Sequence, residues 1–381
     1  MAKNRMLKEI GTYLRQARKD TGLSLREVTQ RIGFDNYQTL SSIENGKREV
    51  KAWELAKFSD IYHKSFEYLL GIEAAKPRPT FLWRNRNIEK NVKEIECKIE
   101  KYCEDYHNLE KLAGINPSSF NLCLFKGKPK DYDEVADKAR DACKILGLGS
   151  RPALSLADVL EQEQGVKILY LDMGDSGSAV SNFNDKTGPA IIINKREAPW
   201  RRNYDIAHEL FHILTWTLYD IKEVHPVGKE KSKAEQFSDY FASILLLPED
   251  SLAKELERHI VKRKLPFSAC VSIAREFGVS TIALLWRLVN LRYLSKNKVQ
   301  ELQDADKLTA IDRKQRQEDW HTPPPKSPNF VALAFICLQQ GLISRGRFAE
   351  LVEINRSDIS EFLEMYGLDE TREDVAEIIT S

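Results

Sequence analysis

The segment that most constrains this chain lies near its middle, where residues 203–216 read NYDIAHELFHILTW. His208 and His212 are four positions apart, so a helix places both side chains on one face. The positions around them are mostly apolar, which predicts a helix that is buried on most sides. Such burial suits a site that has to exclude competing ligands.

Glu209 completes an H-E-x-x-H spacing of the kind found in zinc hydrolases. One helical turn brings two imidazoles within reach of one tetrahedral Zn²⁺ at ~2.0–2.1 Å each. A carboxylate beside the first histidine can then take a proton from water on the metal. The spacing fixes only three positions, however, and an amphipathic helix with two polar side chains on one stripe satisfies it equally well.

A second helical segment, at residues 235–242, carries two further carboxylates. Glu235 and Asp239 are four positions apart and share a helix face. One of them can complete a His₂Glu ligand set, which leaves a coordination position open for water. The other can accept the free N–H of a ligand imidazole and fix its tautomer.

Two resemblances give these residues roles. The string from Glu235 to Asp239 resembles the second metal helix of thermolysin-like gluzincins, which implies Glu235 as the third ligand and Asp239 as the support of a ligand histidine. The longer run from INK through HELFH to FASILLLP (241–248) resembles the ImmA/IrrE family of metallopeptidases, over about residues 130–295. This resemblance implies a minimal α+β zinc peptidase. Members of the family have been linked to cleavage of XRE-type repressors, and some carry such a domain in the same chain.

The region before the histidine helix is predicted to form a small sheet. Residues 166–173 (VKILYLDM) and 189–195 (PAIIINK) have the composition of strands, and the stretch between them is a loop or part of a third strand. We expect 189–195 to be an edge strand that accepts an extended substrate. The plainer alternative is that Ile191–Ile193 form the sheet core, and both can hold on different faces and edges of the strand. Peptide hydrolysis also needs a donor for the developing oxyanion. The candidates are His225, Tyr219 and Tyr240.

Residues 1–71 contain five short helical patterns and carry a local charge of +4, from 13 Lys/Arg and 9 Asp/Glu. Ser24 is placed to cap one helix and Gly33 to end it. A short turn and a second helix follow, which is the layout of a helix-turn-helix unit. The run LSSIENGKR at 40–48 resembles the Cro/repressor-like (XRE) family, over roughly residues 7–71.

The XRE resemblance implies binding of double-stranded DNA through residues 1–71, with the N-terminal part of the second motif helix in the major groove. The side chains expected to reach base edges are those of Gln38, Thr39 and Ser42. Lys47 and Arg48 are expected near phosphates. The plainer alternative is that all five are ordinary solvated positions of a small helical bundle.

Composition limits the rest of the interpretation. No apolar stretch approaches the ~20 residues needed to span a bilayer, and the N-terminus has no apolar signal core, so we expect a cytoplasmic protein with no membrane partner. The six cysteines form no CxxC pair that could hold a metal. With 58 basic and 57 acidic residues the net charge is +1, so any nucleic-acid binding has to be local.

These patterns predict a mainly α protein with an α+β middle domain. The expected parts are an all-α helix-turn-helix bundle at 1–71, a linker and helical connector at 72–130, a minimal zincin-like peptidase domain with a small sheet at 131–295, a second linker at 296–328 and a C-terminal helical domain at 329–381. Within the connector we expect one long amphipathic helix over 82–115. We expect WRNRN at 83–87 to be a solvated linker, and the alternative is that it contacts DNA phosphates together with Lys90 and Lys93.

The predicted function is a DNA-binding transcriptional regulator that carries a zinc-dependent endopeptidase. Its substrate would be an XRE-type repressor or the chain itself, cleaved in a stress or mobile-element response. The C-terminal helices would serve dimerisation or partner binding, so a homodimer is a further prediction. The alternative is a non-proteolytic transcription factor whose peptidase-like domain senses a ligand or a metal. Glu209 argues against that alternative, because a pure sensor has no need for this carboxylate.

Overall fold

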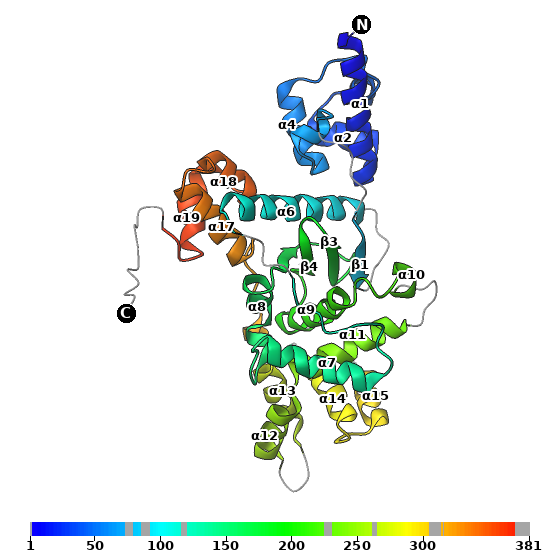
Figure 1. Ribbon diagram of the computed structural model, residues 1–381, viewed down its shortest axis with the longest axis vertical. Helices are drawn as coiled ribbons and strands as arrows, with labels where there is room; N and C mark the ends of the chain where they lie inside the picture. Colours follow the sequence, from blue (N-terminus) through cyan, green and yellow to red (C-terminus); the bar gives the residue numbers. More distant parts are fainter. Residues whose placement is uncertain are drawn as a thin grey trace.

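The computed structural model describes residues 2–72, 79–84, 92–115, 120–224, 231–260, 265–304, 314 and 316–369. A four-stranded sheet lies in the middle of the molecule, with helices on its two faces and at both ends of the chain (Figure 1). The predicted fold class, mainly α with an α+β middle, is confirmed.

The first five helices form a small bundle at one end of the molecule (Figure 1). They are α1 (Ala2–Thr21), α2 (Leu25–Ile32), α3 (Tyr37–Glu44), α4 (Ala52–Tyr62) and α5 (Phe66–Leu69). The Ser24 hydroxyl accepts a hydrogen bond from the Glu27 N–H, and the Glu27 carboxylate accepts one from the Ser24 N–H, which starts α2. Gly33 ends α2 with a φ of 84°, a left-handed conformation that favours glycine. Val28 and Leu40 are fully buried between the helices.

The sheet has the strand order β1-β3-β4-β2. Its strands are β1 (Phe81–Arg84), β2 (Lys167–Leu171), β3 (Ala179–Asn184) and β4 (Gly188–Asn194). β3 pairs antiparallel with both β1 and β4, whereas β2 and β4 are parallel. Both predicted strands are present, with a third strand between them. The expectation that 189–195 is an edge strand is wrong, because β4 has a hydrogen-bonded neighbour on each side.

Alternate side chains of the sheet enter two separate cores. Ile191 and Ile193 belong to one core and Ile192 to the other. The first core is built with α7 (Tyr132–Ile145), α8 (Leu156–Gln162), α9 (Pro199–Leu214), α11 (Lys233–Leu246), α13 (Phe267–Glu276) and α14 (Thr281–Asn290). The second core is built with α6 (Val92–Leu112), α17 (Pro328–Gln339), α18 (Arg345–Val352) and α19 (Ile359–Glu364). The connector helix and the C-terminal helices therefore share one core with the sheet.

The connector differs from its prediction. Residues 81–84 form β1 and α6 begins only at Val92, so the connector is not one long helix. Trp83 and Arg84 are buried, at 2% and 6% exposure, so the expectation of a solvated linker at these two positions is also wrong. The physical reason is the short aromatic and apolar run at 81–83, which favours a half-buried strand. The charged residues around this run indicated an exposed segment instead. Residues 85–91 lie outside the described part of the chain.

Helix α6 lies between the N-terminal bundle and the sheet (Figure 1). Arg31 of α2 forms an ion pair with Glu94, and Lys64 forms one with Glu100 at an N···O distance of 2.6 Å. The bundle is therefore seated on the connector helix by charged contacts in addition to the packing of α1 on α6.

The structure also contains three further helices and three 3₁₀ turns in the described ranges. They are α10 (Ile221–Val224), α12 (Glu249–His259), α15 (Lys296–Asp304) and three 3₁₀ turns at Pro152–Leu154, Gln317–Asp319 and Arg356–Asp358. Helix α15 falls inside the predicted linker at 296–328, and its Val299 is fully buried in the first core. The domain boundaries themselves stay predictions. In the described ranges no single helix is long and apolar enough to cross a membrane, and α13 with α14 reaches that length only as a pair bent by 99°.

Candidate metal centre and DNA-reading helix

Helix α9 brings His208 and His212 together on one buried face. Pro199 begins the helix at a position where its missing N–H has no helical acceptor to lose. Every residue from Asp205 to Leu214 is buried, as the apolar pattern predicts. The Nε2 atoms of the two histidines are 3.2 Å apart. The helix thus places two imidazole nitrogens at a common point in the interior.

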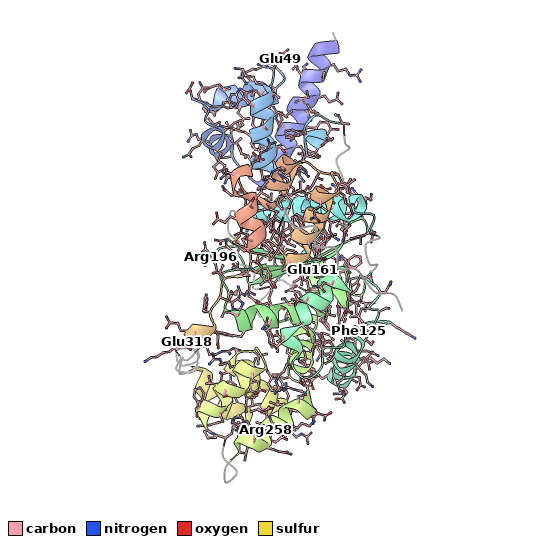
Figure 2. The ribbon with its side chains drawn as sticks, turned by 90° about the vertical axis from the view of Figure 1, so that its left-hand side faces the viewer. Glu49, Phe125, Glu161, Arg196, Arg258 and Glu318 are labelled. Carbon is pink, nitrogen blue, oxygen red and sulfur yellow. The ribbon has the colours of Figure 1, made fainter. Side chains whose placement is uncertain are left out.

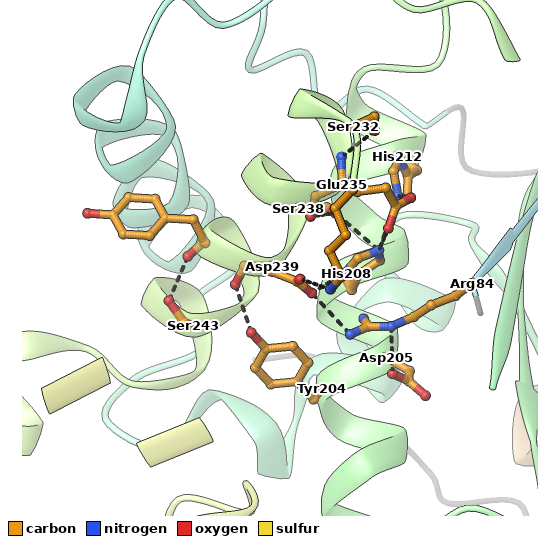
Figure 3. Close-up of polar contacts among 12 residues, drawn as sticks. Arg84, Tyr204, Asp205, His208, His212, Ser232, Glu235, Ser238, Asp239 and Ser243 are labelled. Carbon is orange, nitrogen blue, oxygen red and sulfur yellow. Dashed lines mark hydrogen bonds and ion pairs between the residues drawn. The ribbon is translucent and has the colours of Figure 1, made fainter. Parts of the chain in front are cut away.

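Helix α11 brings a carboxylate to the same point (Figure 3). The Ser232 hydroxyl caps this helix by accepting a hydrogen bond from the Glu235 N–H at 3.1 Å. Glu235 therefore stands in the first turn, where the partial positive charge of the helix N-terminus favours a carboxylate. Its Oε1 is 3.1 Å from His212 Nε2 and its Oε2 is 3.4 Å from His208 Nε2.

The three side chains fit a tetrahedral cation. Ligands at ~2.0–2.1 Å from a tetrahedral zinc ion lie ~3.3–3.4 Å from one another. The observed separations of 3.1, 3.2 and 3.4 Å lie close to that value. Among the described residues, His208, His212 and Glu235 are the cluster of potential ligands whose donor atoms all lie within 4.8 Å of one another. Two imidazoles and one carboxylate are also a donor set that zinc accepts.

Asp239 supports His208 from the side opposite the cluster. Its Oδ1 is 2.9 Å from His208 Nδ1, so an N–H at Nδ1 leaves Nε2 without a proton, facing Glu235, His212 and the Ser238 hydroxyl at 3.1 Å. The pKa of His208 is raised: burial opposes the charged imidazole, while Asp239 and Glu235 favour it. The pKa values of both carboxyls are lowered, because their hydrogen bonds to the imidazoles outweigh the effect of burial. The cluster therefore favours ionised carboxylates, the form that binds a metal.

Glu209 has no comparable partner. Its side chain is buried at 1% exposure, and neither carboxylate oxygen accepts a hydrogen bond from the described residues. Burial raises its pKa, and the imidazoles of His212 and His208 and the nearby Ser181 hydroxyl act against that shift. The Ser181 hydroxyl on β3 is likewise buried without a hydrogen-bond partner in the described part of the chain. Because an unsatisfied buried polar group is costly, such a group in a native fold calls for an explanation, and a bound ligand or substrate is one.

Arg84 is a site residue that the sequence analysis missed. Its guanidinium extends from the end of β1 toward α9 and α11, the two helices that carry the clustered side chains (Figure 3). Nη2 is 3.1 Å from Asp239 Oδ1, and Nε is 3.3 Å from Asp205 Oδ1. The Tyr204 hydroxyl donates to the Asp239 carbonyl oxygen at 2.8 Å, and Lys231 Nζ is 2.6 Å from Asp239 Oδ2. The only signal in the sequence is the apolar run before Arg84, which favours a strand without indicating its neighbour.

The three predicted oxyanion donors fare differently. Tyr219 is partly buried, with the Lys128 ammonium 5.3 Å from its ring centre. Tyr240 packs edge-to-face on Tyr132, with ring centres 5.0 Å apart. Within the described ranges, neither hydroxyl is hydrogen-bonded to the three clustered side chains. His225 lies outside the described residues. The arrangement therefore does not single out any of the three.

In the bundle, α3 presents the residues predicted to read DNA. The Asn36 side chain caps this helix by accepting hydrogen bonds from the Thr39 N–H at 3.1 Å and the Thr39 hydroxyl at 3.2 Å. Gln38 is exposed, and Thr39 and Ser42 are partly exposed. The Thr39 hydroxyl is thus engaged in the cap, which leaves Gln38 and Ser42 as the more available side chains.

The two predicted phosphate contacts also separate. Lys47 is exposed. Arg48 instead donates hydrogen bonds at 2.7 and 2.9 Å to the carboxylate of Glu54, whose side chain is fully buried. The pKa of Glu54 is lowered, because the hydrogen bonds from Arg48 and the Lys51 N–H together outweigh its desolvation. Arg48 therefore stabilises the start of α4, a role that the sequence did not indicate.

Two family models match the chain. Residues 161–289 match the peptidase M78 family, described as an IrrE N-terminal-like domain, and residues 9–65 match a helix-turn-helix domain. The first match contains β2, β3, β4 and the helices that carry the clustered histidines and Glu235. The second contains α2 and α3. No curated protein matches the chain.

Proposed function

We propose that this chain, which joins a helix-turn-helix domain to an IrrE-like domain of a metallopeptidase-type family, is a DNA-binding regulator with a zinc-dependent endopeptidase activity. The observation that carries the proposal is the cluster of the buried His208 and His212 with the partly buried Glu235, beside the Glu209 carboxylate, which accepts no hydrogen bond from the described residues. The cluster has the size and donor types of a zinc site, and Glu209 adds the group that hydrolysis needs.

Each residue has one task in the proposed reaction. His208, His212 and Glu235 would hold a zinc ion, which when bound would lower the pKa of water and polarise the scissile carbonyl. Glu209 accepts a proton from the attacking water and later donates it to the leaving amine. Its burial suits this exchange, because burial raises its pKa and so makes the carboxylate a stronger base toward water.

The residues around Asp239 position the histidine. Asp239 fixes the tautomer of His208 through Nδ1, and Arg84 and Lys231 fix Asp239 in turn. A ligand histidine held in this way keeps one tautomer and one ring orientation. These three residues act through His208 and do not touch the reacting atoms.

The proposed substrate is an XRE-type repressor or a segment of this chain. The helix-turn-helix domain supports DNA binding, and it is seated on α6 next to the sheet. A substrate that binds the same operator as this domain would be held near the peptidase, and such tethering gives effective concentrations of ~mM for short linkers. Cleavage would then end repression at that operator.

Metal analysis and proteolysis on the same purified chain test the proposal. The wild type should hold about one zinc ion per chain, and H208A/H212A should lose it. When candidate repressors are added, mass spectrometry should find fragments with the wild type only. Full zinc occupancy in the double variant would remove the metal assignment. A wild type that binds zinc and DNA, yet yields no fragment of any repressor or of itself, would favour the alternative of a non-proteolytic sensor.

A further inference from the structure

The outer edge of β3 is covered by a strand from outside the IrrE-like region. The match to that region begins at residue 161 and contains β2, β3 and β4, so β3 would be an open edge of this unit taken alone. β1 closes the edge by antiparallel pairing, with Phe81 opposite Asn182 and Arg84 opposite Ala179. An extended peptide that adds itself to an open sheet edge makes the same kind of pairing.

One side chain of β1 projects toward the helix that carries Glu235. Leu82 stands opposite Ser181 of β3. The Ser181 hydroxyl and Glu209 lie on the same side of the sheet, the side that faces the first core. The Leu82 side chain is 6% exposed and packs in an apolar cluster with Val224 and Ala234. Ala234 directly precedes Glu235 in α11. Leu82 therefore packs on the helix turn that carries a proposed metal ligand.

The next side chain on the same face of β1 reaches the other side of the cluster. Arg84 contacts Asp205 on α9 and Asp239 on α11 through ion pairs of 3.3 and 3.1 Å (Figure 3). β1 thus runs past the point where the two helices bring the three proposed ligands together. In an extended chain, alternate side chains face one way, so an apolar residue and a basic residue two positions later make these two sets of contacts.

The remaining contacts of β1 lie on the opposite face. Trp83 is buried in the second core, and its Nε1 donates a hydrogen bond to Glu96 at 3.0 Å. β1 is nevertheless only four residues long, and the hydrogen bonds of one such ladder are the interactions that a competing strand can replace.

We propose that β1 is an intramolecular substrate mimic, which occupies the substrate-binding edge of β3 and keeps the peptidase latent. The proposal rests on the proposed function, because it assigns this edge to a peptidase site. It also defines the substrate class as an extended segment with a bulky apolar residue two positions before a basic one. Substrate binds only when β1 leaves the edge, so its apparent affinity is the intrinsic affinity multiplied by the undocked fraction.

A binding experiment with the full chain tests the proposal without requiring turnover. The probe is a fluorescent peptide with the sequence of residues 79–84, PTFLWR. The released variant L82D/R84Q removes the apolar and ionic contacts of β1, and it should bind the probe at least about 10-fold more tightly than the wild type. The locked variant F81C/N182C places a disulfide between directly opposed positions of β1 and β3. Its oxidised form should not bind the probe, whereas its reduced form should.

Controls make each outcome decisive. The single variants F81C and N182C, which cannot form the cross-link, should bind the probe equally with and without reductant. If L82D/R84Q does not fold, the milder Leu82→Ala takes its place. Equal binding by the oxidised and reduced locked forms, or no binding by a folded released variant, would overturn the proposal. Probe binding by the released variant, together with a wild-type chain that holds no zinc and cleaves nothing, would instead contradict the proposed function and retain the strand exchange.

Discussion

Two buried carboxyls, Glu161 on α8 and Glu209 on α9, differ in whether the described chain supplies them with a hydrogen-bond donor. Both are almost fully inaccessible, at 7% and 1% exposure, and burial raises the pKa of both. Glu161, near the middle of the molecule in Figure 2, accepts a hydrogen bond from the Tyr106 hydroxyl at 3.3 Å. Tyr106 in turn accepts one from Asn329 at 2.7 Å. The oxygens of Glu209 accept none from the described residues.

Under the proposed function, this difference separates a structural polar group from a catalytic one. A buried polar group that is paired by its own chain fixes the packing around it. A buried polar group that the chain leaves unpaired can still form a hydrogen bond with a ligand or a substrate. The same contrast recurs in the bundle, where Arg48 is paired with Glu54 and Lys47 is exposed. Burial alone would have placed the two carboxyls in one class.

The sharpest test of this contrast replaces each carboxyl by its amide. Glu209→Gln should lower the rate of repressor cleavage by about 10²–10⁴-fold, because general acid–base catalysis contributes that much. Zinc content should not change. Glu161→Gln, the matched control, should cleave at the wild-type rate. If both variants cleave alike, the absence of a partner for Glu209 does not indicate a catalytic role.

A smaller difference is expected between the two carboxylates of α11. Glu235→Ala removes a direct donor to the proposed zinc ion, whereas Asp239→Ala removes a residue that acts through His208. The second loss should weaken zinc binding by about 10–100-fold, and the first should weaken it more. Competition with a chromophoric chelator measures both affinities. The reverse order would make Asp239 the ligand.

The parts of this arrangement that could be predicted are local in sequence. The i, i+4 spacings of His208 with His212 and of Glu235 with Asp239 follow from helix geometry, and the capping residues follow from the backbone groups left open at helix ends. Arg84 could not be predicted, because its partner Asp239 lies 155 positions away and only the assembled sheet joins them. The internal position of β4 was missed for the same reason: strand order depends on pairing across the chain and not on the strand itself.

The pH dependence of stability should separate Glu161 from an ordinary carboxyl. Burial raises its pKa from the usual 4.5 to about 7 in the folded chain, so between these values the unfolded chain has lost a proton that the folded chain retains. Stability from this group is therefore complete below about pH 4.5 and declines as pH rises to about 7. At ~1.4 kcal/mol per pKa unit, the decline is on the order of 3 kcal/mol. Urea titrations of wild type and Glu161→Gln across this range measure it, and parallel pH curves for the two chains would contradict the assignment.

The smallest expected effects lie in the helix-turn-helix domain, where the contrast between paired and exposed groups predicts two kinds of loss. Arg48→Ala should lower the stability of the bundle by ~1–3 kcal/mol, because it leaves the buried Glu54 without its charged partner. Lys47→Ala should change stability by less than ~0.5 kcal/mol. It should weaken binding to all DNA sequences alike and reduce the salt slope by about one phosphate contact.

Hydrogen exchange at the α4 amides of the full chain measures the stability change. Binding to an enriched duplex at several salt concentrations measures the loss of DNA affinity and the salt slope. Gln38→Ala is the matched control for sequence reading, since it should alter the preferred sequence with little change in salt slope. If Arg48→Ala leaves α4 protected and changes the salt slope as Lys47→Ala does, then a paired cation can still serve DNA. The presence or absence of a partner within the chain would then distinguish structural from functional groups only near the sheet, where Glu161 and Glu209 are both buried.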